Sequence, residues 1–308
     1  MAAALSRESR FHLGDGTTMP CIGFGTYQIK EQDCEAPVAK ALQLGYRHID
    51  TAQAYENEAA CGRALAASAV PREDVYITTK LWPGNPDWNQ PPLTYEQTIE
   101  CCEASIQKLG IQKCDLYLIH TPLGGGKAGR LAQYRALVEC QKRGLCSSIG
   151  VSNYGEAHLQ EIIDAGMPLP AANQLELHPR SQKSELLAFM QAKGILPIAY
   201  SSLAPLSNWR AGQQSAKTDA QRAEDTCVGR VAANYEGKSE AQILLRFALQ
   251  KGWAILPKSV NEARALANLD VFSFSLSTAD MTELEAMETG ETFAFGSPGQ
   301  ALDPTMCE

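Results

Sequence analysis

Short apolar runs alternate with helical patterns along most of the chain. Each run is almost wholly apolar up to its last residues, which is typical of strands buried on both faces of a parallel sheet. The segments between the runs space their apolar residues three and four positions apart, which predicts amphipathic helices. We predict strands at 21–27, 48–52, 75–81, 116–120, 147–153, 171–177, 196–202 and 254–259.

Several helical patterns have clear boundaries. In the segment 94–110 the apolar face is formed by Ile99, Cys102, Ile106 and Leu109. In the segment 239–252, Ser239 occupies the N-cap position and Gly252 follows the last helical residue. A glycine follows other helical patterns at the place where a left-handed residue ends a helix, at Gly45, Gly110, Gly144, Gly166 and Gly194.

The two ends of the chain add further elements. Two short runs flank Gly14-Asp15-Gly16, which predicts an N-terminal β-hairpin. The segment 277–290 predicts an extra C-terminal helix, capped by Ser277 or Thr278. No linker divides the sequence, so residues 1–308 are interpreted as a single domain.

Eight strands alternating with eight helices predict an α/β fold, a (β/α)8 TIM barrel. The main alternative is a doubly wound open sheet. That fold is disfavoured because no predicted strand is followed by the GxGxxG pattern; "GFGTYQ" at 23–28 lacks the third glycine and opens no helix.

Charge and composition exclude several classes of partner. The net charge is −8 and the chain has no basic run, which argues against nucleic acid or an anionic membrane as a partner. No apolar stretch reaches the roughly 18 residues that span a bilayer, and the first residues lack the apolar core of a signal peptide. We therefore expect a cytoplasmic protein. Ten scattered cysteines, without a CxxC pair, are interpreted as small buried residues in a reducing compartment.

Polar residues gather at the C-terminal ends of the predicted strands, where barrel enzymes have their active sites. Three successive strands contribute Asp50 with Tyr55 shortly after it, Lys80, and His120. Each of these charges would be costly to bury alone, whereas on one rim they can pair. The later strands end with Ser152, Asn153, Asn173, Gln174, Tyr200, Ser201, Lys258 and Ser259.

These residue types fit the reduction of a carbonyl group. A phenol ionises near pH 10, so Tyr55 is a weak acid at neutral pH unless its pKa is lowered. The Lys80 ammonium would favour the phenolate and lower that pKa, and Asp50 would hold Lys80 and balance its charge. His120 would orient a carbonyl oxygen that gains negative charge as hydride is added and is protonated by Tyr55.

Two weaker patterns resemble a metal site and a phosphate-binding loop. The spacing of His48 and Asp50 resembles part of a metal-hydrolase site, with His12, His158 and His178 as further ligand candidates. No HxH pair and no set of rim carboxylates completes it, so we expect no catalytic metal. The segment "GGGKAGR" (124–130) lacks the GK[ST] ending of a phosphate loop and is predicted to be a flexible loop.

With Asp50, Tyr55, Lys80 and His120 identified, the sequence resembles the aldo-keto reductase superfamily over most of its length. "GYRHIDTAQAYENEAACGRAL" resembles the first signature of that family. "MPCIGFGT", "TTKLW", "LYLIH", "IGVSN", "NQLELHP", "AYSSL" and "LPKSVNEARALAN" match its other blocks in the same order. The resemblance implies a barrel that binds NADPH extended across its rim without a Rossmann domain.

The resemblance also implies roles for individual residues. Tyr55 would be the general acid, tuned by Lys80 and Asp50, and His120 would orient the substrate. The cofactor would be bound by Gly25, Thr26, Asp50, Ser152, Asn153, Gln174, Tyr200, Ser201, Leu203, Lys258, Ser259, Arg264 and Asn268. Within this set, Tyr200 would stack on the nicotinamide. The substrate would contact Tyr27, Tyr55, Trp82 and His120.

Lys258, Ser259 and Arg264 are the residues expected to bind the 2′-phosphate of NADPH. The first two lie where the last predicted strand gives way to a helix, and a helix N-terminus favours an anion. Arg264 adds a planar donor group suited to phosphate. We therefore expect a preference for NADPH over NADH.

The chain departs from the family pattern near the expected substrate. Tyr27 and Thr121 occupy positions where many members have tryptophan, and Ala267 one where many have a glutamate that contacts the adenine. The segment 83–92 adds Trp88 near the rim. The loop after Leu203 and the tail from Glu291, with Phe293 and Phe295, are expected to complete the pocket.

We therefore predict a cytosolic, monomeric, NADPH-dependent reductase of small aldehydes or ketones. Two alternatives remain. A catalytically idle member of the fold could act as an NADPH-binding regulatory subunit, although the intact set of four catalytic candidates argues against it. A metal-dependent barrel hydrolase is the other alternative.

Overall fold

The computed structural model describes residues 5–206, 227–290, 292, 294, 296–297, 300–301 and 303–307. Its main sheet contains eight parallel strands, and each pairs with the next one along the chain. The strands are β3 (Phe24–Gly25), β4 (His48–Asp50), β5 (Tyr76–Leu81), β6 (Cys114–Ile119), β7 (Cys146–Ser152), β8 (Ala172–Glu176), β9 (Leu196–Tyr200) and β10 (Ala254–Ile255).

Backbone hydrogen bonds close this sheet into a barrel. Ile22 and Ile255 form an isolated parallel bridge, and the Gly23 amide donates to the Ile255 carbonyl at 2.8 Å. The chain just before β3 is thereby joined to β10. The predicted (β/α)8 barrel is confirmed.

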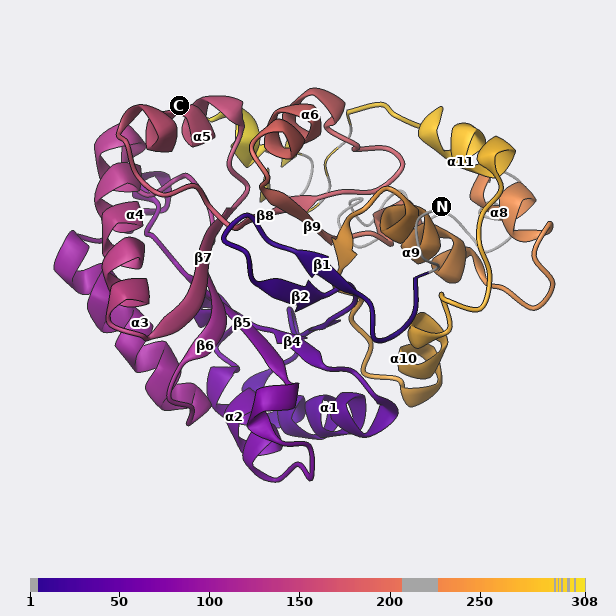
Figure 1. Ribbon diagram of the computed structural model, residues 1–308, viewed down its shortest axis with the longest axis horizontal. Coiled ribbons are helices and arrows are strands. Elements are labelled where there is room, and N and C mark those ends of the chain that lie inside the picture. Colours follow the sequence, from indigo (N-terminus) through magenta and orange to yellow (C-terminus); the bar gives the residue numbers. More distant parts are fainter. Residues whose placement is uncertain are drawn as a thin grey trace.

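Helices surround the barrel (Figure 1). They are α1 (Glu31–Leu44), α2 (Glu58–Ala66), α3 (Tyr95–Leu109), α4 (Gly126–Lys142), α5 (Glu156–Asp164), α6 (Ser184–Ala192), α8 (Cys227–Ala232), α9 (Glu240–Gln250), α10 (Glu262–Leu269) and α11 (Thr278–Glu285). The predicted caps are present: Ser239 forms a capping box with Gln242, and Ser277 caps α11. All six predicted glycines have positive φ, from 64° at Gly110 to 105° at Gly45.

The N-terminal hairpin covers one end of the barrel. Strands β1 (Arg10–His12) and β2 (Thr18–Pro20) pair in antiparallel fashion, and they lie in the middle of the ring of strands in Figure 1. Leu13 and Met19 are buried in a cluster with interior side chains of the barrel, including Leu116, Leu118 and Ile198. Because the hairpin covers this end, the opposite end, where the strands terminate, is left for a ligand.

Most strands are shorter than the sequence predicted, although β6 is one residue longer than its predicted range and β7 has the predicted length. The last one ends at Ile255, whereas we expected it to continue to Ser259. Asn153 and Ser201, at the ends of β7 and β9, have φ values of 63° and 53° and turn the chain away from the sheet. The Asn153 amide still donates to the Gln174 carbonyl on β8 at 2.9 Å, and the rim residues beyond it belong to the site described below.

The prediction of a loop over 124–130 is wrong, because α4 begins at Gly126. Two contacts explain why a helix forms despite the glycines. A Cβ atom at Gly129 would lie 2.0 Å from the Gly124 carbonyl oxygen, so glycine allows the first turn to pack tightly on the preceding segment. The buried guanidinium of Arg130 pairs with Glu161 on α5 at 2.7 Å.

The remaining described elements do not alter this architecture. Strands β11 (Gly296–Ser297) and β12 (Gln300–Ala301) form a two-stranded sheet near the C-terminus. Among the described helices, none is long and apolar enough to cross a membrane. All ten cysteines are free thiols, and seven of them are buried, as expected for small core residues.

Candidate active site

Lys80 and Asp50 form a buried ion pair where β4 and β5 end. The Lys80 ammonium is fully buried, with its Nζ atom 2.5 Å from Oδ1 of Asp50. The same Nζ donates to the Thr51 carbonyl at 2.9 Å and to the phenol oxygen of Tyr55 at 3.2 Å. An ammonium has three N–H groups, so these three acceptors satisfy it completely. The structure thus brings together three residues that are up to 30 positions apart in the sequence.

A short 3₁₀ turn places Tyr55 above this pair. The turn Gln53–Tyr55 follows β4, and the next residue, Glu56, has a φ of 56° that redirects the chain into α2. The buried Asn57 side chain holds the turn, because its amide donates to the Thr26 and Ile29 carbonyls and its oxygen accepts from the Thr51 hydroxyl at 2.7 Å. Thr26 therefore supports the backbone of the site and is buried beneath it.

Burial controls the protonation of this trio. It raises the pKa of Asp50 and lowers the pKa of Lys80, and in each case the charge of the partner opposes the shift. Burial also raises the pKa of Tyr55 well above 10, and the Asp50 carboxylate raises it further. The expectation of a lowered phenol pKa is therefore wrong for this structure. The physical reason is that desolvation of a phenolate outweighs the attraction of an ammonium whose charge Asp50 already balances.

His120 lies beside the phenol, just after β6. Its ring centroid is 5.4 Å from that of Tyr55 and 5.7 Å from that of Trp82, in edge-on arrangements. Burial, with a smaller effect from Lys80, lowers the pKa of His120 well below 6.5, so the imidazole is neutral at neutral pH. Its Nδ1 atom has no hydrogen-bond partner within the described structure.

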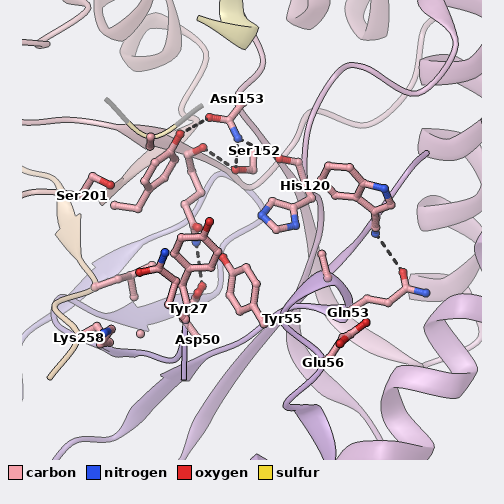
Figure 2. Close-up of a pocket in the computed structure, with 18 of the residues that line it drawn as sticks. Tyr27, Asp50, Gln53, Tyr55, Glu56, His120, Ser152, Asn153, Ser201 and Lys258 are labelled. Carbon is pink, nitrogen blue, oxygen red and sulfur yellow. Dashed lines mark hydrogen bonds between the residues drawn. The ribbon is translucent and has the colours of Figure 1, made fainter. Parts of the chain in front are cut away.

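A chain of hydrogen bonds continues from Asp50 along the rim. Gln174 donates to Oδ2 of Asp50 at 2.8 Å, and the Ser152 hydroxyl donates to the Gln174 carbonyl at 2.8 Å. Asn153 donates to the Ser152 hydroxyl at 3.1 Å and accepts from the Tyr200 hydroxyl at 2.7 Å (Figure 2). Strand ends β7, β8 and β9 are thereby coupled to the ion pair.

These residues line one cavity of about 900 Å³. In Figure 2, Lys258 and Glu56 lie on opposite sides of the Tyr27 and Tyr55 rings. The predicted catalytic and substrate residues that line it are Tyr27, Asp50, Tyr55, Trp82 and His120. The predicted cofactor residues that line it are Gly25, Asp50, Ser152, Asn153, Gln174, Tyr200, Ser201, Leu203 and Lys258.

Comparisons with known proteins show the family to which the chain belongs. The sequence pattern of the aldo/keto reductase family matches residues 21–289. The chain belongs to the aldo-keto reductase family. An aldo-keto reductase of Mycolicibacterium smegmatis is 41% identical, over 92% of this chain and 94% of that protein. The methylglyoxal reductase DkgA of Yersinia pestis is 38% identical, over 91% of this chain and 92% of that protein.

A solved structure agrees with the sequence relatives. An aldo-keto reductase of Bombyx mori in complex with NADP superposes with a TM-score of 0.81 at 30% identity, covering 95% of this chain and 96% of that one. Close agreement over nearly all of both chains confirms the fold independently of the motifs.

Three predicted cofactor residues of this aldo-keto reductase lie at α10, outside the cavity lining. Ser259 accepts from the Asn261 amide at 3.1 Å, and Asn261 in turn caps the helix by accepting from the Arg264 amide at 3.0 Å. The Arg264 side chain is exposed, whereas Asn268 is buried in the helix. Lys258, which does line the cavity, connects the rim to this helix start.

Several cavity residues were missed by the sequence reasoning. Gln28, Gln53, Glu56 and Gln90 lie in the segments beyond the strand ends, and Cys101 lies on α3. Trp88 was expected near the rim, and it does line the cavity. The polar side chains of Gln53 and Glu56 after β4, and of Gln90 after β5, were the signals that could have indicated these residues. The expected contributions of 207–226, Phe293 and Phe295 lie outside the described residues, although Ala294 lines the cavity.

The metal alternative gains no support from the geometry. Across the parts of the chain that the structure describes, no three His, Cys, Asp or Glu side chains converge in a way that could hold a metal ion. His48 instead lies in the barrel interior, where its Nε2 is 2.9 Å from the Thr78 hydroxyl.

Proposed function

We propose that this protein is an NADPH-dependent reductase that converts an aldehyde or ketone to an alcohol, with Tyr55 as the proton donor. The observation that carries the proposal is the contact between Lys80 Nζ and the Tyr55 hydroxyl at 3.2 Å, at the wall of a cavity that His120 also lines. The family and the NADP-bound neighbour support the cofactor.

Tyr55 is in its acid form before the reaction. Its raised pKa keeps the phenol protonated at neutral pH. When the phenol gives its proton to the developing alkoxide, the remaining phenolate accepts a hydrogen bond from Lys80, and this charge-assisted bond stabilises the product state. Asp50 keeps Lys80 charged, because the carboxylate opposes the effect of burial on the pKa of the lysine.

His120 acts as a neutral hydrogen-bonding group. Its lowered pKa leaves the imidazole uncharged, so the ring can orient the carbonyl oxygen without competing with Tyr55 as the proton source. The substrate oxygen would lie between the imidazole and the phenol. Bound NADPH supplies the hydride to the carbonyl carbon.

The cavity fits a nicotinamide cofactor. The Oε1 atom of Gln174 accepts no hydrogen bond within the described structure, and the ring of Tyr200 lines the same region. An amide acceptor beside an aromatic face suits a carboxamide-bearing ring. Lys258 and Arg264 would bind the 2′-phosphate near the start of α10, where backbone N–H groups favour an anion.

The direct test is the oxidation of NADPH by the purified protein with a panel of neutral aldehydes, measured by the loss of absorbance of the reduced nicotinamide. We expect turnover that depends on the aldehyde. NADPH binding without turnover on any carbonyl would instead identify the idle regulatory subunit.

A further inference from the structure

The segment that follows β5 forms one wall of the cavity. Trp82 begins it and Leu93 ends it, and half of its residues line the cavity. The lining members are Trp82, Gly84, Trp88, Gln90, Pro91 and Leu93. Trp82 was expected to contact the substrate, and the other members take no part in the catalytic chemistry proposed above, so their arrangement points to a role in substrate recognition.

This segment has a defined fold. Its base is closed by the Leu93 amide, which donates to the Pro83 carbonyl at 3.0 Å. The side chain of Gln133 on α4 donates to the carbonyls of Pro83 at 3.1 Å and Leu93 at 3.3 Å. Between these points, Asn85 and Gln90 form a bridge around a 3₁₀ turn. The position of the turn is therefore fixed from both the barrel and a helix.

The turn contacts the Trp82 ring through a stacked ring and a hydrogen bond. Trp88 stacks on Trp82 with ring centroids 5.7 Å apart and an interplanar angle of 17°. The Trp82 indole N–H donates to Oε1 of Gln90 at 2.7 Å, and the Trp82 backbone amide donates to Oε1 of Gln53 at 3.0 Å. On the cavity side, an edge-on contact relates Trp82 to His120.

The stack leaves apolar surface exposed at the cavity. Trp88 is 53% exposed, it lines the cavity, and its ring continues the apolar surface of the Trp82 ring on which it stacks. Tyr27, Ala54 and Cys101 also line the cavity, and Lys258 is the only lysine or arginine among its described lining residues. A flat apolar group would therefore find aromatic partners here and would lose no ionic contact.

We propose that the stacked pair Trp82–Trp88, the indole wall, selects carbonyl substrates that carry a planar apolar group of aromatic size. This inference rests on the proposed function and names its substrate class. The wall lies next to His120, so an aryl group attached to the reacting carbonyl would contact the indoles while the oxygen remains beside Tyr55. Small aliphatic aldehydes would reach the same catalytic groups without that contact.

The test compares benzaldehyde with propanal in the wild type and in Trp88→Ala. We expect the substitution to lower kcat/KM for benzaldehyde about tenfold more than kcat/KM for propanal, mainly through KM, because only the larger substrate loses a packing partner. Trp88→Phe should restore most of the benzaldehyde value. Leu169→Ala, which truncates an exposed apolar side chain away from the cavity, should change neither value.

Equal losses for both aldehydes, or no loss for either, would overturn the inference. Gln90→Leu provides a second variant in case Trp88→Ala fails to fold. It keeps both indoles but removes the hydrogen bond to the Trp82 indole N–H. It should lower the ratio of kcat/KM for benzaldehyde to kcat/KM for propanal, as Trp88→Ala does. NADPH binding checks the fold of each variant. A wild type that reduces neither aldehyde nor any other carbonyl refutes the proposed function itself, and with it the inference.

Discussion

The ammonium of Lys80 lies between Asp50 and Tyr55, 2.5 Å from the carboxylate and 3.2 Å from the phenol. The carboxylate is therefore the group that keeps a buried lysine charged next to a proton donor. Burial alone lowers the pKa of Lys80, and Asp50 is the largest influence in the opposite direction.

Asp50→Asn should make turnover depend on pH. Without the carboxylate, burial lowers the pKa of Lys80 further, so the lysine is neutral over more of the pH range and cannot stabilise the phenolate. We expect kcat at neutral pH to fall by about 10²–10³ and to recover partly as the pH decreases and the ammonium re-forms. Lys80→Met should be as slow at every pH. A pH profile of Asp50→Asn parallel to that of the wild type would contradict this role.

Arg264→Ala should weaken NADPH binding by about tenfold or more, because the 2′-phosphate loses its bidentate partner. NADH lacks this phosphate, so its binding should be nearly unchanged. Fluorescence titration with each cofactor measures the difference. Arg135→Ala, which removes an exposed arginine on α4, controls for net charge. Equal weakening of both cofactors would show that Arg264 does not bind the 2′-phosphate.

Glu56→Gln should broaden the substrate range toward anions. Glu56 lines the cavity beside Gln53 and Tyr55, so its carboxylate repels a substrate that carries a second carboxylate. We expect a several-fold gain in kcat/KM for 4-formylbenzoate and little change for benzaldehyde. Glu73→Gln makes the same charge change before β5, at the opposite end of the barrel, and should have no effect. A gain of equal size in that control would rule out a local repulsion.

His48 should contribute to loss of stability in acid. Burial, together with Lys80 and Arg10, lowers its pKa in the folded state to about 3. Between the pKa of an unfolded histidine, about 6.5, and this folded value, the unfolded chain binds a proton here that the folded chain does not. The free energy of unfolding therefore falls as the pH decreases, by up to about 1.4 kcal/mol per pH unit. Urea unfolding of His48→Gln should show a correspondingly smaller loss; an unchanged pH slope would exclude His48.

Much of the site could be predicted because a charged residue at the end of an apolar strand is costly to bury unless it pairs with another polar group. Asp50, Lys80 and His120 were identified in this way, and the structure places them around Tyr55. The direction of the Tyr55 pKa shift was not predictable. It depends on whether the burial of the phenol outweighs the attraction of the Lys80 ammonium, whose charge Asp50 balances. The sequence shows the neighbours of a group but not its solvation.

Loop contributions were also hidden from the sequence. Gln53 and Gln90 act on Trp82 through contacts that depend on the folded turn after β5. Likewise, the glycines of 124–130 suggested a loop, whereas the tight packing at Gly129 and the Arg130–Glu161 pair favour a helix. Three expectations about the protein stay predictions: its organisation as a single domain, its monomeric state and its cytoplasmic location.

The central claim, that Tyr55 supplies the proton, is tested most directly by Tyr55→Phe. Two quantities are measured on the same sample: the rate of NADPH oxidation with benzaldehyde or propanal, and the dissociation constant of NADPH. The account predicts a rate at least about 10²-fold lower, with the dissociation constant nearly unchanged, because only the acidic hydroxyl is removed. A variant that retains substantial turnover would contradict the account.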